Sequence, residues 1–132
     1  TMLTMMQKVI THGTGVRMGW AYGMNGVEIA GKTGTTNDNC DAWFMCIVPR
    51  LVAGAWVGGE DQFISLNSRG EGSVMALPIV GDFLRKVHKD ANLNINRTDR
   101  FARPAGWVEV KCEDSEQPTS TASTTAQDEF FD

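Results

Sequence analysis

The residues from Gly26 to Thr33, GVEIAGKT, could support two different kinds of chemistry, and both depend on Lys32. Their spacing satisfies G-x-x-x-x-G-K-[ST], the pattern of a loop whose backbone amides and lysine hold nucleotide phosphates. The same lysine opens the four residues Lys32-Thr33-Gly34-Thr35, a K-T-G element typical of acyl transfer through a serine. The elements that would position Lys32 decide between the two.

The neighbouring sequence argues against a phosphate-binding loop. Such a loop follows a buried strand and opens a helix, because the helix N-terminus and the backbone amides hold the phosphates. Upstream of Gly26 the sequence VRMGWAYGMN lacks the pattern of a buried strand, and downstream GTTNDN is a poor helix start. The supposed loop, VEIA, itself resembles a strand. We therefore interpret the nucleotide match as accidental.

An edge strand through Lys32 suits the K-T-G element instead. Val27–Ala30 alternates weakly and predicts a strand running into Lys32 and Thr33. Side chains alternate between the two faces of a strand, so Lys32 lies on one phase and the hydroxyls of Thr33 and Thr35 on the other. An ammonium and hydroxyls suit a carboxylate ligand, and a strand N–H can stabilise an oxyanion. Gly34 leaves room for a substrate backbone. For a K-T-G without further context, a solvated strand-to-loop junction is the better interpretation.

The remaining pattern predicts an antiparallel sheet with packed helices, an α+β fold. Helical spacing at the start predicts a helix that ends at His12-Gly13, followed by a loop over 15–26. Ala42–Val48 and Leu51–Val57 predict a hairpin joined by Pro49-Arg50. Further predicted elements are turns over 34–39, a polar loop over 62–72, a helix from about Val74 to Lys89 and a short strand Val108–Lys111. The predicted apolar face of that last helix is Ile79, Val80, Phe83, Leu84 and Val87.

The charge of the chain is unevenly distributed. Residues 113–132 hold six of the sixteen acidic residues and none of the twelve basic ones, and they are rich in Ser and Thr, so we predict a disordered acidic tail. No basic run is present, which argues against a nucleic-acid partner. Three cysteines without C-x-x-C spacing and two separated histidines, His12 and His88, predict no metal site.

A few other side chains have preferred structural interpretations. We expect the three thiols to be buried or half-buried, although one pair could still bridge. Trp43 and Trp56 are expected in the core, and Trp20 is a weaker candidate for a substrate groove. Asp41 could be the partner of a nearby base or a loop cap, and we favour the structural use over a catalytic one.

The blocks GKTGTTNDNCDAWF, LVAGAWVG and LPIVGDFL together resemble the C-terminal part of the transpeptidase domain of class A, bifunctional penicillin-binding proteins. MMQKVITHGTG resembles the helix and loop that precede K-T-G there. The resemblance implies a partial β-lactamase/transpeptidase-like fold, with residues 1–112 as the C-terminal part of that domain. It also implies a bacterial protein at the periplasmic face of the inner membrane, anchored by sequence absent from this chain.

The resemblance further implies serine acyl transfer that crosslinks peptidoglycan stem peptides at D-Ala-D-Ala and is inhibited by β-lactams, with no cofactor. Lys32 and Thr35 are the implied catalytic residues, and Thr33, Gly34 and Thr35 the implied substrate-binding residues. The implied partners are stem peptides, β-lactam antibiotics and the upstream part of the same domain.

The nucleophile of such an enzyme is not found in this sequence. The family carries S-x-x-K and then S-x-N before K-T-G, and no S-x-x-K occurs here. Ser65-Leu66-Asn67 fits S-x-N but follows the K-T-G, so we interpret it as coincidence. We therefore expect a fragment that is inactive alone. The alternative is a non-catalytic cell-wall binding or scaffold module.

Overall fold

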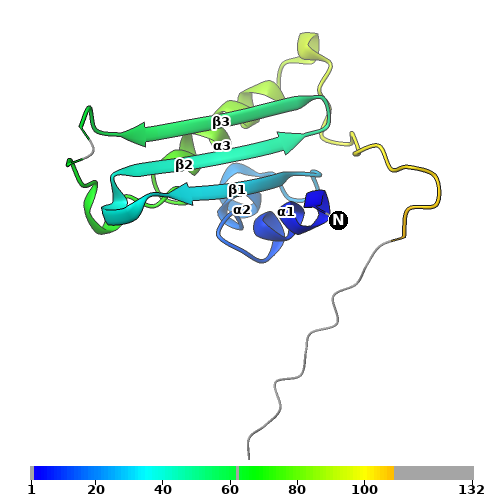
Figure 1. Cartoon of the computed structure of the whole chain (residues 1–132). Coiled ribbons are helices and arrows are strands. Elements are labelled where there is room, and N and C mark those ends of the chain that lie inside the picture. Colours follow the sequence, from blue (N-terminus) through cyan, green and yellow to red (C-terminus); the bar gives the residue numbers. More distant parts are fainter. Residues whose placement is uncertain (1, 62, 109–132) are drawn as a thin grey trace, which may run out of the picture.

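The computed structural model describes residues 2–61 and 63–108 (Figure 1). Three strands form one antiparallel sheet in the order β1-β2-β3. Helices α1, α2 and α3 pack with it, which confirms the α+β prediction. The helices and strands, in chain order, are α1 Met2–Thr11, α2 Arg17–Tyr22, β1 Ala30–Thr35, β2 Asp41–Val48, β3 Leu51–Gly58 and α3 Ala76–Val87. Short 3-10 turns cover Asn37–Asn39, Asn67–Arg69 and Ala91–Leu93.

The β2–β3 hairpin forms as predicted, within one residue at the outer ends. Its register pairs Val48 with Leu51 beside the turn and Trp43 with Trp56 further along. Arg50 in the turn has φ 70°, the left-handed conformation that a type II turn requires at the residue after its proline, here Pro49. The long alternation of apolar residues in both strands accounts for this agreement, because burial on one face fixes the register.

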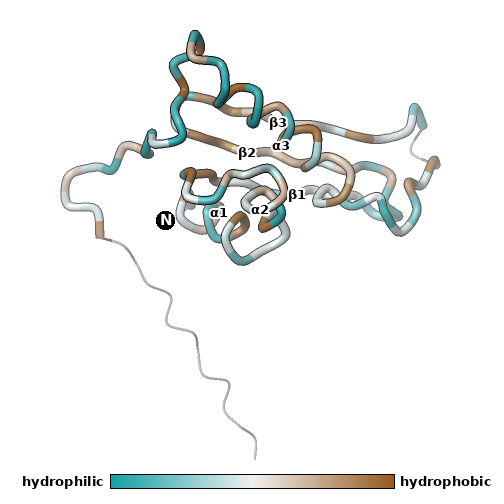
Figure 2. The backbone as a smooth tube through the Cα atoms, turned by 180° about the vertical axis from the view of Figure 1, so that it is seen from behind, coloured by the Kyte–Doolittle hydropathy of each residue, from teal (hydrophilic) through white to brown (hydrophobic). Residues whose placement is uncertain are grey.

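The core lies between the helices and one face of the sheet, which we call the inner face. Along β2 every second residue is buried, namely Ala42, Phe44, Cys46 and Val48. The helices contribute the matching side chains, with Ile10 from α1, Met18 from α2 and Leu77, Val80 and Leu84 from α3. Figure 2, seen from behind, shows the helices in front of the strands. Burial of this apolar surface is the main force that holds helices and sheet together.

The predicted apolar face of α3 is partly wrong. The helix lies within two residues of its predicted bounds, but Ile79 and Phe83 are about half exposed, at 51% and 46%. Ala76 and Leu77 are fully buried instead. The buried side is displaced because α3 contacts α2 as well as the sheet, with Gly81 closely approached by the ring of Tyr22.

The prediction that Trp43 and Trp56 fill the core is also wrong. They are 44% and 47% exposed and form a tilted pair with ring centroids 6.5 Å apart. Because side chains alternate along a strand, the burial of Phe44 on the inner face places Trp43 on the opposite one. We call that opposite side the outer face.

The predicted loop over residues 15–26 contains a helix, α2. The four glycines of this stretch suggested a loop, but Met18 is completely buried and Tyr22, one turn later, packs against the core. Gly23 ends the helix in the left-handed conformation, and its N–H donates to the carbonyls of Gly19 and Met18. Tertiary burial of the Met18 side therefore outweighs the weak local helix propensity.

The bounds of β1 are displaced toward the K-T-G residues. The strand was predicted from Val27 into Lys32 and Thr33 with turns from Gly34, whereas it runs from Ala30 to Thr35. The four residues Lys32 to Thr35 are thus strand throughout and pair with β2. Most of the predicted strand Val108–Lys111 and the predicted tail 113–132 lie outside the described residues.

Candidate functional site

Lys32, Thr33, Gly34 and Thr35 lie together on an edge strand. β1 pairs with β2 on one side, and within the described part of the chain no strand pairs with its other edge. Lys32 pairs with Met45 on the outer face and is exposed, whereas Thr33 and Thr35 pair with inner-face residues. Lys32 is the third residue of a strand and no helix begins there, so the site lacks the geometry of a phosphate-binding loop.

The backbone of β1 presents its polar groups at this free edge. The N–H of Thr36 donates to the carbonyl of Asp41 over 3.1 Å, which identifies Thr36 as facing β2. In an antiparallel ladder, alternate residues direct their N–H and C=O groups to the partner strand. Thr33 and Thr35 are out of phase with Thr36 and therefore direct theirs to the free edge. The N–H of either residue can therefore donate to an acceptor that lies beside this edge.

The side chains of Lys32 and Thr35 each form a hydrogen bond within the protein, and each keeps at least one hydrogen that can be donated to a ligand. Nζ of Lys32 donates to the carbonyl of Thr33 over 2.7 Å, which uses one of the three N–H bonds of the ammonium. Oγ1 of Thr35 accepts a hydrogen bond from the N–H of Gly72 at 3.3 Å, so its own hydrogen stays available. The edge thus combines one cation, hydroxyl donors and outward amides, a set suited to binding a carboxylate.

The glycine of the element lies against the neighbouring strand. A Cβ added at Gly34 would lie 3.1 Å from Cβ of Trp43, tighter than ordinary van der Waals contact. Gly72, whose N–H reaches Thr35, is more constrained, since its Cβ would lie 2.0 Å from the carbonyl oxygen of Trp43. Gly34 thus allows Trp43 to lie closely beside it, and Gly72 allows the loop before α3 to approach the end of β1.

Asp41 anchors the turn that follows Thr35. Its Oδ1 accepts a hydrogen bond from Nε1 of Trp56 at 2.8 Å, and its Oδ2 accepts one from the hydroxyl of Thr36 at 3.2 Å. The backbone N–H of Asp41 donates back to Oγ1 of Thr36 over 2.9 Å. These bonds agree with the expectation that Asp41 caps a loop.

Ser65 and Asn67 also have structural contacts near this turn. Oγ of Ser65 donates to the carbonyl of Asp38 over 2.6 Å and accepts a hydrogen bond from the N–H of Asn67. The carbonyl of Asn67 in turn accepts a bond from Nδ2 of Asn39. This S-x-N sequence therefore ties the loop before α3 to the β1–β2 turn.

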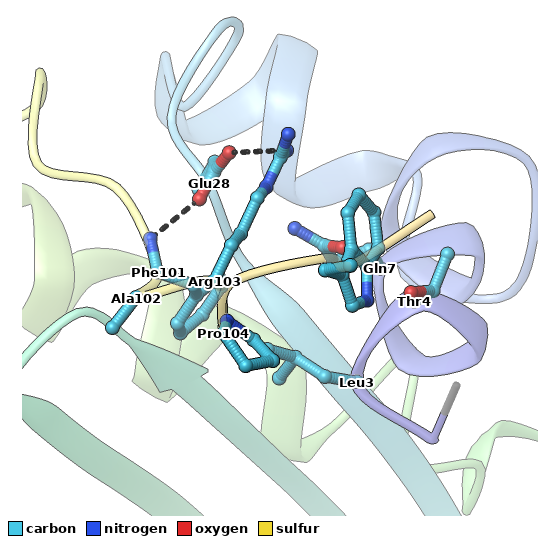
Figure 3. Close-up of a pocket in the computed structure, with 9 residues that line it drawn as sticks. Leu3, Thr4, Gln7, Glu28, Phe101, Ala102, Arg103 and Pro104 are labelled. Atoms are coloured by element: carbon cyan, nitrogen blue, oxygen red, sulfur yellow. Dashed lines mark hydrogen bonds and ion pairs between the residues drawn. The ribbon is translucent and has the colours of Figure 1, made fainter. Parts of the chain in front are cut away.

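A cavity of about 250 Å³ lies at the opposite end of β1, beside its first residues (Figure 3). The carboxylate of Glu28 is central to it, and one oxygen accepts the N–H of Phe101 at 2.7 Å. The other oxygen lies 3.6 Å from the guanidinium of Arg103, which stacks over the ring of Trp107. The lining residues are Leu3, Thr4, Gln7, Glu28, Phe101, Ala102, Arg103, Pro104 and Trp107. Its charged groups already pair with one another.

Two residues near K-T-G were not singled out by the sequence, Thr14 and Gly72. The hydroxyl of Thr14 lies 3.1 Å from that of Thr33, and Gly72 bonds to Thr35 as described. These contacts join residues 19 and 37 positions apart, which no local pattern indicates. Trp20, the weaker candidate for a substrate groove, lies on α2 with 68% of its surface exposed.

In residues 2–61 and 63–108 no three His, Cys, Asp or Glu side chains lie close enough to hold a metal ion. Over the same residues, none of the helices has the length and apolar character needed to cross a bilayer.

Penicillin-binding proteins 1A from two bacteria are similar in sequence to this chain. No family model matches the sequence. Penicillin-binding protein 1A of Pseudomonas aeruginosa is 37% identical over 110 residues, which is 83% of this chain and 12% of that protein. Penicillin-binding protein 1A of Rickettsia typhi is 43% identical over 72 residues, or 54% of this chain and 9% of that protein.

A solved structure agrees with these sequence relatives. The crystal structure of penicillin-binding protein 1A from Haemophilus influenzae superposes with a TM-score of 0.60 and 25% identity, over 67% of this chain and 14% of that one. The chain thus spans about a tenth of the length of the relatives that it matches. Sequence and fold together lead to one conclusion: the chain is homologous to the class A penicillin-binding proteins of the 1A type.

Proposed function

We propose that this chain is part of a peptidoglycan D,D-transpeptidase and supplies the K-T-G wall of its acyl-transfer site. The observation that carries the proposal is the free edge of β1, which has the exposed Lys32 on its outer face and Thr33 and Thr35 on its inner face. The outward amides of the same strand add an oxyanion site. Homology to penicillin-binding protein 1A supports this chemistry over other uses of a carboxylate-binding edge.

The proposed reaction is two successive acyl transfers. A serine oxygen attacks the carbonyl between the two D-Ala residues of a stem peptide, the C–N bond breaks and the terminal D-Ala leaves with a proton. An amine of a neighbouring stem then attacks the ester, forming the crosslinking amide and returning the proton to the serine. A β-lactam acylates the same serine by opening its ring, so no leaving group departs.

Each residue of the K-T-G wall has a proposed role in this scheme. Lys32 supplies positive charge near the reacting serine and the substrate. The hydroxyls of Thr33 and Thr35 bind the terminal carboxylate, which charge-assisted hydrogen bonds favour. The outward N–H of Thr35 stabilises the oxyanion of the tetrahedral intermediate. Gly34 keeps the strand free of a side chain where the substrate backbone lies.

The nucleophilic serine is proposed to lie outside this chain. No S-x-x-K occurs in the sequence, and Ser65 is engaged with the carbonyl of Asp38. The chain alone is therefore predicted to be inactive. The serine and the S-x-N residues would come from the upstream part of the same domain, which completes the other wall of the site.

Two apolar surfaces support contact with that upstream part. The outer face carries Trp43, Met45 and Trp56, each 39–47% exposed. A groove of about 390 Å³ lies between β3 and α3, where Val52, Ile79 and Phe83 are 46–61% exposed. Surfaces this apolar are usually covered in the working protein. We propose that the rest of the transpeptidase domain covers both.

The proposed surroundings follow from the same function. Stem peptides and β-lactam antibiotics are the proposed ligands of the site. The protein would work at the periplasmic face of the bacterial inner membrane, where peptidoglycan is crosslinked, held there by an anchor outside these residues.

A comparison of two proteins with a fluorescent penicillin tests the fragment proposal. The full reading frame that contains these residues should be labelled covalently, whereas the 132-residue chain should not be. A covalent adduct on the isolated chain would show that the nucleophile lies within it. A folded full-length protein that is never labelled would instead favour a non-catalytic cell-wall binding or scaffold module.

A further inference from the structure

The loop between α1 and α2 is held tightly against the end of α1. The N–H of Gly15 donates to the carbonyl of Val9 over 2.9 Å, and a Cβ at Gly15 would lie 2.8 Å from Cδ1 of Ile10. A Cβ at Gly13 would lie 3.0 Å from Cα of Val9. Larger residues at these two positions would force the loop away from the helix. The position of Thr14, between the glycines, is therefore well defined.

The same packing brings Thr14 to the edge of β1. α1 contacts β1 directly, with Cδ1 of Ile10 so close to Gly31 that a Cβ there would lie 2.8 Å from it. Beyond this contact, Oγ1 of Thr14 lies 3.1 Å from Oγ1 of Thr33. Thr14 is exposed and Thr33 half-buried, so the hydroxyl pair faces solvent beside the K-T-G residues.

The contact between the hydroxyls of Thr14 and Thr33 limits the directions in which their hydrogens can point. Each hydroxyl has one hydrogen and can accept further bonds, so when Thr14 donates to Thr33, the hydrogen of Thr33 is directed elsewhere. Donation to the oxygen of Thr33 also polarises its O–H bond, which strengthens donation to a third group. An anion beside Thr33 favours this orientation of the pair. Without Thr14, the hydroxyl of Thr33 can rotate and gains no polarisation.

We propose that Thr14 is a positioning residue that orients the hydroxyl of Thr33 for the carboxylate of the substrate or of a β-lactam. The inference rests on the proposed acyl-transfer function and adds to it a recognition element from outside the K-T-G strand. Thr14 acts through Thr33 and takes no part in bond making or breaking. Removing the hydroxyl of Thr14 therefore reduces how much faster a ligand with a free carboxylate reacts than the same ligand without one.

The test uses two β-lactams that differ only at this group, one with a free carboxylate and one with its methyl ester. Their acylation rate constants are measured on the full reading frame, and the ratio of acid to ester is the carboxylate preference. Thr14→Val keeps the shape and removes the hydroxyl, and it should lower the preference about tenfold, the order expected for weakening a hydrogen bond to a charged group. Thr14→Ser restores the hydroxyl and should restore the preference.

Two further variants make the result decisive. Thr14→Ala loses the hydroxyl without the added methyl of valine and should behave as Thr14→Val does. Thr98→Val makes the same change at another exposed threonine and should leave the preference as in the parent. A loop tether without a recognition role would slow acid and ester equally, leaving the ratio unchanged.

The outcomes separate this inference from the function on which it rests. An unchanged ratio in both Thr14→Val and Thr14→Ala, in a parent that is acylated, overturns the role of Thr14 and leaves the transpeptidase proposal standing. A folded parent that reacts with neither β-lactam overturns the transpeptidase proposal, and the role of Thr14 with it. A reduced ratio that Thr14→Ser does not restore also overturns the role of Thr14.

Discussion

The indole N–H of Trp56 donates to Oδ1 of Asp41 over 2.8 Å and so joins β3 to the turn that follows Lys32–Thr35. The second oxygen of Asp41 bonds to the hydroxyl of Thr36. One side chain thereby fixes the end of the K-T-G strand relative to both of the other strands. This relationship gives the first prediction.

Replacing Asp41 should loosen the K-T-G end of the sheet. Asp41→Ala removes the acceptor of Trp56 and of Thr36, and we expect the free energy of unfolding to fall by about 1–3 kcal/mol. Trp56→Phe removes the indole donor alone and should cost less. Denaturant titrations of parent, single and double variants measure the coupling between the two side chains. Additive effects would contradict a direct Asp41–Trp56 contribution.

Gly81→Ala should destabilise the protein although it lies in a helix. An exposed glycine in a helix interior costs about 1 kcal/mol relative to alanine, so the change would ordinarily help. Here the new Cβ would lie 2.5–2.7 Å from ring atoms of Tyr22. Overpacking of this kind costs about 1–3 kcal/mol and outweighs the helix gain. Thermal unfolding measures the result, with Asp82→Ala on the exposed side of the same helix as control. A rise in Tm for Gly81→Ala would contradict the packing against Tyr22.

Glu28 should hold the segment around Phe101 on the body of the protein. Its side chain is 18% exposed, accepts the N–H of Phe101 and lies near the guanidinium groups of Arg103 and Arg100. Glu28→Gln keeps an acceptor but removes the charge, and should cost about 0.5–1 kcal/mol, an effect that salt diminishes. Glu28→Ala also removes the acceptor and should cost more.

Amide hydrogen exchange at Phe101 is the measurement for this segment. Exchange should accelerate in Glu28→Ala and to a lesser degree in Glu28→Gln. Asp82→Asn, which disrupts an exposed ion pair with Arg85, is the matched control and should leave exchange at Phe101 unchanged. Equal protection of Phe101 in the parent and in Glu28→Ala would refute the contact.

Cys46 should make the stability of the protein depend on pH in the alkaline range. Burial raises the pKa of its thiol from the ordinary 9.0 to about 11, against a smaller lowering by a hydrogen bond with the backbone of Ala53. The unfolded chain loses this proton near pH 9, whereas the folded chain keeps it until about pH 11. Between these values the folded state binds more protons, so the free energy of unfolding falls as pH rises.

The full contribution of Cys46 is present below pH 9, and a shift of this size corresponds to about 3 kcal/mol. Denaturant titrations at pH 8, 9 and 10 measure it against Cys46→Ala, in which the group cannot ionise. The variant should show a weaker decline than the parent over this range. The same decline in both proteins would mean that other groups cause it.

The sequence was most informative where one pattern persisted over many residues. The β2–β3 hairpin and α3 could be predicted because eight or more residues alternate or repeat regularly and one side of each must be buried. The helix α2 could not, because its six residues include a glycine and depend on burying Met18 against residues far along the chain. Similarly, an alternating strand does not reveal which phase faces the helices, and Trp43 was assigned to the wrong side.

Part of the candidate site was likewise beyond the sequence. Lys32 to Thr35 could be recognised because the K-T-G element is defined by the types and order of consecutive residues. The contact of Thr14 with Thr33 arises from the packing of α1 on β1, and that of Gly72 with Thr35 from the loop before α3. Such contacts depend on tertiary structure and leave no local trace.

The most direct test of the account is covalent labelling of the full reading frame by a fluorescent penicillin, in the parent and in Lys32→Ala. Lys86→Ala, which removes an exposed lysine of α3, is the matched control. The account predicts strong labelling of the parent and of the control, and much weaker labelling of a folded Lys32→Ala protein. Equal labelling of all three would contradict a role for the K-T-G strand in acyl transfer.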